Sequence, residues 1–128
     1  MRWLLCVVSL LLLPVTVHAQ EETRTGKVSA AVTALGASFG LMEIVGSEAC
    51  IQQGTCYEAN KVLPDGKGAA ATFGRSAIKA AGTTAATVAL LKLRQKHPRW
   101  ALLGSIGFAG FNGYLTARSF DHLRRGQR

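Results

Sequence analysis

This chain of 128 residues carries a formal net charge of +8, and its length suits a single small domain. Most of the 15 basic residues lie between or beyond the apolar stretches, and no platform of aromatic residues accompanies them, so nucleic acid is not an expected partner. The sequence contains no nucleophile elbow, phosphate loop, HExxH motif or cluster of metal ligands, which argues against an enzyme and against a metal or cofactor.

The first residues predict export. Arg2 opens a short basic start, an apolar run follows over residues 3–13, and Pro14 breaks it. Val17 and Ala19 place small residues at the two positions that a signal peptidase reads, so residues 1–19 are expected to be a signal peptide that is cleaved after Ala19. The alternative is an uncleaved anchor helix, although the run is short for a span of about 20 residues. Residues 20–27 are polar and are expected to form a flexible lead-in.

The first apolar segment after the leader predicts a helix over 28–46. It has no charged residue from 28 to 42, and Gly36 and Gly40 form a GxxxG pair. Small residues at this spacing let helix backbones approach closely, which is how helices associate in lipid. A polar connection follows over 47–68, and Pro64-Asp65-Gly66 is a turn signal within it. Cys50 and Cys56 in this connection are a candidate disulfide if the loop faces an oxidising compartment, and two free thiols otherwise.

The second segment predicts a helix over 69–95 and the third a helix over 98–120. Arg75 and Lys79 interrupt the second segment, and its twelve uncharged residues from 80 to 91 are too few to cross a bilayer alone. In the third segment, residues 100–117 carry no charge, which makes it the strongest candidate span. Both segments contain ridges of small residues that are expected to pack against other helices, namely Ala77, Ala81 and Ala85 in the second and Ser105, Ala109 and Gly113 in the third.

Charged residues inside such segments are costly unless they are paired or reach water. Arg75 and Lys79 are four residues apart and share a helix face, where like charges repel, so acidic partners are expected opposite them. The sequence therefore predicts a polar cluster at one end of the bundle. Its members are Glu43, Ser47, Glu48, Glu58, Asn60, Arg75 and Lys79. The cluster is either a set of paired, snorkelling charges near the headgroups or an ion or anion site.

Part of this cluster carries a resemblance. Glu43 followed one turn later by Ser47, then Gly54, then Glu58-Ala59-Asn60 resembles the acidic-x3-Ser/Thr, Gly and E-x-N-P pattern of a group of small uncharacterised bacterial multi-pass membrane proteins. Lys61 stands where that pattern has proline. The resemblance implies a membrane location and a similar helix count, and it implies no activity.

Together these features predict an all-α fold, a small membrane bundle of about three helices within residues 28–128, in the bacterial inner membrane. The expected function is that of a non-enzymatic accessory or structural subunit that acts through helix packing, with the lipid bilayer and a second copy or another membrane protein as partners. The alternatives are an oligomeric transporter or channel protomer and a soluble exported helical domain. Basic residues divide equally between the two sides of such a bundle and leave its orientation open, although a signal peptide favours Gln20 outside and the 47–68 connection inside.

Overall fold

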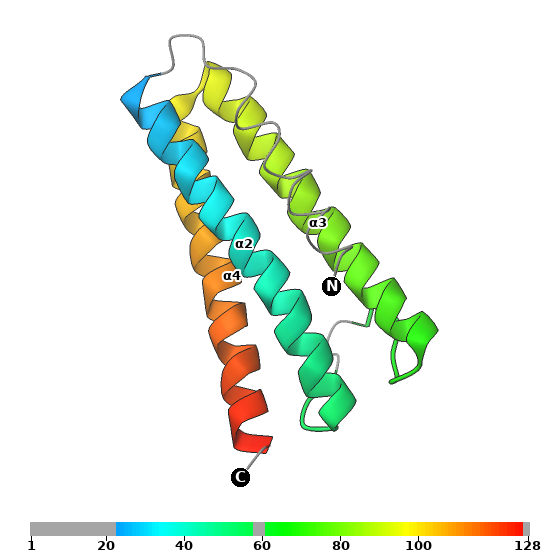
Figure 1. Ribbon diagram of the computed structural model, residues 1–128. Coiled ribbons are helices and arrows are strands. Elements are labelled where there is room, and N and C mark those ends of the chain that lie inside the picture. The colour runs from blue at the N-terminus through cyan, green and yellow to red at the C-terminus, as the bar shows by residue number, and fades with distance from the viewer. Residues whose placement is uncertain (1–22, 58–60, 127–128) are drawn as a thin grey trace, which may run out of the picture.

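The computed structural model describes residues 23–57 and 61–126, and this part of the chain holds three helices and no strand. The helices are α2 (Arg24–Gln53), α3 (Ala69–Lys96) and α4 (Pro98–Gly126), arranged as an up-down-up bundle (Figure 1). The predicted all-α class with three helices is confirmed. The predicted signal peptide, residues 1–19, lies outside the described residues.

Helix α2 is longer at both ends than the predicted 28–46. It begins at Arg24, where the Thr23 side chain caps it by accepting a hydrogen bond from the Gly26 N–H at 3.1 Å. It ends at Gln53, and the next residue, Gly54, has a φ of 78°, the left-handed conformation that closes a helix without steric cost in glycine. The expected lead-in over 20–27 is therefore wrong for 24–27, and the expected loop is wrong for 47–53. The predicted start and end of this helix were drawn where the chain becomes polar. Polar residues such as Glu48 and Gln52 are nevertheless good helix formers, so the helix continues through them.

The other two helices begin where the sequence predicts. Helix α3 starts at Ala69 and ends one residue past the predicted bound, and Pro98 occupies the first position of α4, where its missing N–H costs nothing. Helix α4 continues to Gly126 instead of ending at 120. Its last turns are supported by a 2.9 Å ion pair between Asp121 and Arg125, four residues apart.

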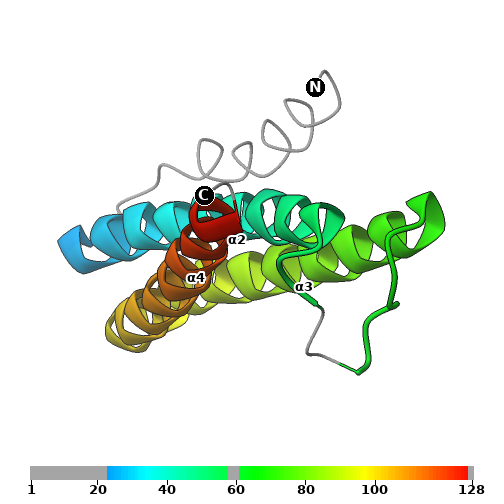
Figure 2. The same ribbon diagram turned by 90° about the horizontal axis from the view of Figure 1, so that it is seen from below.

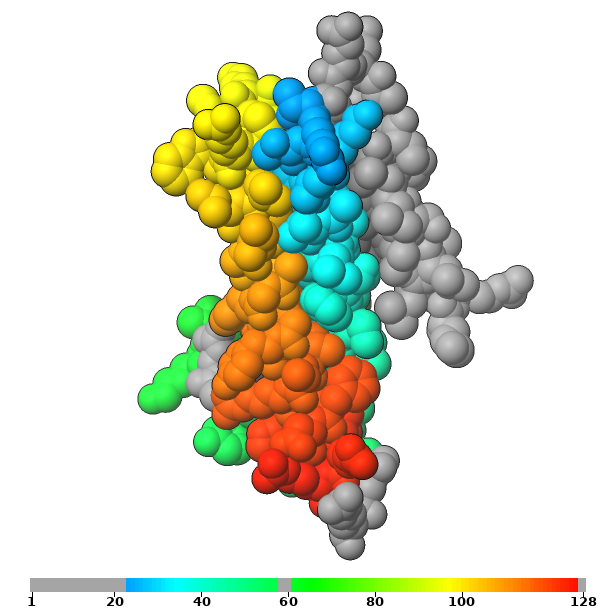
Figure 3. All heavy atoms as spheres, turned by 90° about the vertical axis from the view of Figure 1, so that its left-hand side faces the viewer, coloured from blue at the N-terminus to red at the C-terminus, as the bar shows by residue number. Residues whose placement is uncertain are grey.

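Helix α2 contacts both other helices and packs most closely on α4 (Figures 1 and 2). Glycines allow this approach: a Cβ added at Gly36 would lie 2.6 Å from Cδ1 of Phe108 and 3.1 Å from the backbone of Ala109. At Gly40 an added Cβ would lie 2.8 Å from Cγ2 of Thr83 on α3. The GxxxG pair thus lies where α2 meets both neighbours. Figure 3 shows the face on which α2 and α4 lie against each other.

Hydroxyl groups fill much of the interior between α2 and α4. Ser29, Thr33 and Ser105 are fully buried, and the Ser105 hydroxyl lies 2.7 Å from that of Thr33 and 3.2 Å from that of Ser29. Further along, the Thr116 hydroxyl donates to the Phe39 carbonyl at 2.7 Å. The predicted small residues of α4 lie in this contact too, since Ser105 and Ala109 are buried and Gly113 faces the Phe39 ring. Hydrogen bonds between helices therefore accompany close backbone approach.

The alanine ridge of α3 does not lie at a helix contact. Ala77, Ala81 and Ala85 are exposed, so their prediction as packing residues is corrected. The inward ridge also repeats every fourth residue, but it is offset by two positions. It carries four polar side chains and ends in an apolar one: Arg75, Lys79, Thr83, Thr87 and Leu91. Charged and hydroxyl groups need partners inside the bundle, and this requirement outweighs the small volume of alanine in deciding which face turns inward.

Candidate functional site

A fully buried arginine lies at the end of the bundle that holds the 54–68 connection. The Arg75 guanidinium makes a two-pronged ion pair with Glu48, with Nε to Oε1 at 2.8 Å and Nη2 to Oε2 at 2.9 Å. Its Nη1 donates to the carbonyls of Pro64 and Gly66 at 2.9 and 2.6 Å, and its Nη2 lies 3.5 Å from the Thr72 hydroxyl. These are five hydrogen bonds, as many as a guanidinium has N–H donors, so Arg75 is satisfied inside the protein.

This ion pair ties three parts of the chain together. Glu48 lies on α2, Arg75 on α3, and the two accepting carbonyls lie in the connection between them. Gln52 adds a second tie, since its amide donates to the Lys67 carbonyl at 3.2 Å and to the Thr72 hydroxyl at 2.9 Å. The arrangement is therefore structural: it holds the connection against the ends of α2 and α3.

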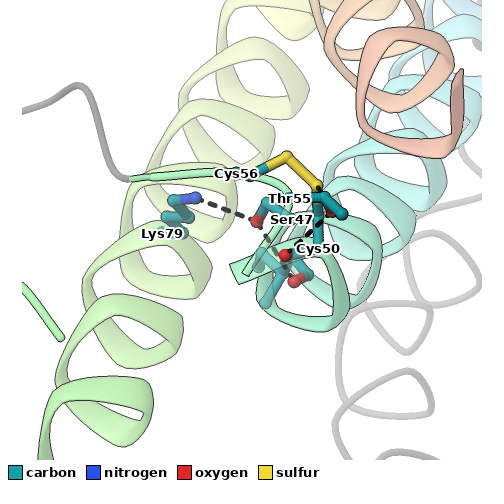
Figure 4. The surroundings of a disulfide bond; sticks show 6 residues. Ser47, Cys50, Thr55, Cys56 and Lys79 are labelled. Carbon is teal, nitrogen blue, oxygen red and sulfur yellow. Dashed lines mark hydrogen bonds between the residues drawn. A yellow bond between two sulfur atoms is a disulfide. The ribbon is translucent and has the colours of Figure 1, made fainter. Parts of the chain in front are cut away.

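A second pair lies one turn further along α3. The Lys79 ammonium donates to the Ser47 hydroxyl at 3.0 Å and lies 3.4 Å from Oε1 of Glu43. Both charged side chains keep some contact with solvent, with 17% of Lys79 and 14% of Glu43 exposed. Figure 4 shows Lys79 reaching from α3 toward Ser47 on α2, beside the disulfide. Unlike Arg75, this pair borders open space.

That space is a cavity of about 380 Å³ that opens to the surface at the same end of the bundle. All three helices and the segment after α2 contribute to its wall. The lining residues are Glu43, Ser47, Ile51, Thr55, Cys56, Tyr57, Lys79, Leu115, Arg118, Ser119 and His122. Its ionisable groups are mostly cationic or neutral, with Glu43 as the acid among them. We take this cavity as the candidate functional site.

A disulfide between Cys50 and Cys56 forms part of the cavity wall, with the two Cα atoms 5.3 Å apart. Cys50 is fully buried in the last turns of α2, and its carbonyl accepts hydrogen bonds from the N–H groups of Thr55 and Cys56. The Thr55 hydroxyl also donates to this carbonyl at 3.2 Å. The bond and these contacts fold the chain after Gly54 back over the helix end.

The disulfide is expected to stabilise the bundle. Cys56→Ser should lower the free energy of unfolding by about 2 kcal/mol, because the bond removes conformational freedom from the unfolded chain over a short loop. Thermal melts of the purified protein with and without dithiothreitol measure this. Reductant should lower the melting temperature of the wild type to that of Cys56→Ser and leave the variant unchanged; a wild type indifferent to reductant would contradict the prediction.

The sequence-predicted cluster is thus divided in two. Glu48 with Arg75 forms the buried tie, Glu43, Ser47 and Lys79 line the cavity, and Glu58 and Asn60 lie outside the described residues. Arg118, Ser119 and His122 belong to the site but were not among the predicted residues. With Leu115 they share one face of α4, and this spacing of three and four residues was the available signal.

The described residues contain no group of three or more His, Cys, Asp or Glu side chains that could hold a metal ion. The two cysteines of the site are bonded to each other. Its hydroxyl, ammonium, guanidinium and imidazole groups suit hydrogen bonding to an anion. Comparison of the chain with protein-family models, with curated proteins and with solved structures found no match.

Proposed function

We propose that this protein is an integral protein of the bacterial inner membrane, a non-enzymatic accessory subunit that acts by packing its helices against a partner in the bilayer. The single observation that carries the proposal is the distribution of side chains between interior and surface. It is the reverse of the arrangement expected for a bundle folded in water.

The interior is small and polar. Its fully buried side chains include Ser29, Thr33, Arg75 and Ser105, and half of its buried apolar residues are alanines. The surface carries the large apolar side chains. Those exposed are Val28, Leu35, Met42 and Val45 on α2, Phe73, Ile78, Val88 and Leu93 on α3, and Trp100, Leu103, Ile106, Phe111, Tyr114 and Phe120 on α4. Lipid tails solvate such a surface, whereas water would leave a large apolar patch on every helix.

Helix α2 adds weaker support. Among the described helices, it alone is long and apolar enough to cross a membrane by length and composition, and its 30 residues span about 45 Å. Helix α4 does not meet this criterion, so the expectation that residues 100–117 are the strongest candidate span is wrong by this measure. The core helix of a water-soluble protein meets the same criterion. The proposal therefore depends on the apolar surfaces of α3 and α4 as well. On α3, the exposed alanines 77, 81 and 85 form a face of small side chains against which a partner helix can pack closely.

Carbonate extraction of membranes from cells that express the full chain tests the proposal. We expect the protein to stay in the membrane pellet at high pH, because its contacts are with lipid tails and not with other proteins' charges. An exported soluble protein and a known integral protein serve as controls. Release into the supernatant with the soluble control would overturn the proposal.

The disulfide makes the orientation testable in the same cells. The disulfide lies at the C-terminal end of α2, whereas Gly26 lies near the N-terminal end. Disulfides persist on the oxidising side of the membrane. A cleaved signal peptide would leave Gln20 on that same side, and a helix with both ends on one side does not cross. A spanning α2 therefore requires either reduced cysteines in the cell or a retained N-terminal segment that does not itself cross the bilayer. Thiol labelling in intact cells and sequencing of the mature N-terminus distinguish these two arrangements.

A further inference from the structure

The cavity at the end of the bundle has hydrogen-bond donors that the fold itself does not use. Lys79 is engaged with Glu43 and Ser47, and the Thr55 hydroxyl donates to the Cys50 carbonyl. By contrast, the side chains of Arg118, Ser119 and His122 make no hydrogen bond or ion pair with any described residue. All three line the cavity from one face of α4.

The charges favour an anion in this space. Glu43 neutralises Lys79 at 3.4 Å, so the positive charge left at the lining is that of the Arg118 guanidinium, with the His122 imidazole one turn further along α4. Arginine is the side chain best suited to two-pronged binding of an oxyanion. Ser119 lies between them in sequence and adds a neutral donor.

We propose that this cavity binds a phosphate group, held by Arg118 with Ser119 and His122. A planar carboxylate is satisfied by one guanidinium, whereas the tetrahedral phosphate accepts hydrogen bonds from several directions. The donors here are three side chains spaced along one face of α4, those of Arg118, Ser119 and His122. A volume of about 380 Å³ exceeds that of one phosphate and leaves room for the glycerol or other group esterified to it.

Two sources present this chemistry: the phosphodiester headgroup of an anionic lipid and a free phosphate or phosphate monoester. The lipid source rests on the proposed function, because the cavity lies at a bundle end, where the headgroup layer would be. The free source does not depend on it. For the lipid source, the basic side chains of the cavity would attract anionic lipid from the neighbouring headgroup layer.

The experiment compares the full-length wild type with Arg118→Gln and with Arg124→Gln as a matched control. Arg124 is exposed on the same helix and lies outside the cavity lining, so its replacement removes the same charge from the same region. Binding of inorganic phosphate is measured by calorimetry in a neutral detergent at low salt. Binding of phosphatidylglycerol is measured by native mass spectrometry, with diacylglycerol as the lipid that lacks phosphate.

We expect Arg118→Gln to weaken binding of at least one phosphate probe by about 10-fold or more, the usual effect of losing hydrogen bonds to a charged group, and Arg124→Gln to weaken it less than about 2-fold. Binding of phosphatidylglycerol alone identifies the headgroup as the source, and binding of inorganic phosphate identifies the free ion. Absence of binding by the wild type, equal retention of diacylglycerol, or equal weakening by both variants would overturn the proposal. A protein that carbonate releases but that binds phosphate through Arg118 would overturn the membrane function and leave the site standing.

Discussion

Arg75→Met is expected to lower the free energy of unfolding by about 3–5 kcal/mol, the largest effect of any single change considered for this protein. The substitution leaves the carboxylate of Glu48, a residue that is only 8% exposed, without its cation. It also leaves the carbonyls of Pro64 and Gly66 without their donor, so the connection loses its tie to α3. Denaturation of the purified protein in detergent, followed by circular dichroism, measures the change.

Three further variants separate burial of a lone charge from loss of the tie. Arg75→Met combined with Glu48→Leu should recover much of the loss, because the uncompensated carboxylate is gone. Arg75→Lys should recover little, since an ammonium has three donors and cannot form the two-pronged pair. Arg99→Met, at an exposed arginine, should change stability by less than about 0.5 kcal/mol. If Arg75→Met and Arg99→Met were equally stable, the structural role of the buried pair would be refuted.

The sequence predicts the three helices well because their signals are local. Long uncharged stretches are separated by the Pro64-Asp65-Gly66 turn and by His97-Pro98, and both breaks depend on backbone chemistry that neighbouring residues determine. The end of α2 is less predictable, because Ser47 to Gln53 is polar and helical at once. Gly54 was the better signal for the helix end. The helix is closed by the left-handed conformation of this glycine, and the polarity of the preceding residues does not end it.

The candidate site is predicted only in part because its members come from distant positions. Charge complementarity alone suggests that Glu43 and Glu48 meet Arg75 and Lys79, but the rotation of α3 decides which acid pairs with which cation. The same rotation turns the alanine ridge outward. Arg118 and His122 have no partner motif in the sequence. Their place in a cavity follows from the crossing of α4 over α2, which depends on side-chain contacts along both helices.

Ile106→Lys separates a bilayer environment from an aqueous one. Ile106 lies near the middle of the uncharged stretch of α4, and 54% of the residue is exposed. In a bilayer a lysine near the centre of a helix costs about 2.5–3.5 kcal/mol, so we expect most of the variant to be lost from the membrane fraction. In water an exposed isoleucine is replaced by lysine with a change of less than about 0.5 kcal/mol.

Phe120→Lys is the matched control, because Phe120 is 43% exposed on the same helix but lies among Arg118, Asp121 and Arg124 at the bundle end. A lysine there reaches the headgroups and should be tolerated. Quantitative blotting of membrane fractions for both variants and the wild type gives the comparison. Equal abundance of all three would contradict lipid contact at Ile106, because no position at bilayer depth accepts a new charge as easily as one at the headgroup layer. Selective loss of Ile106→Lys, by contrast, is an effect that an aqueous bundle with the same fold does not produce.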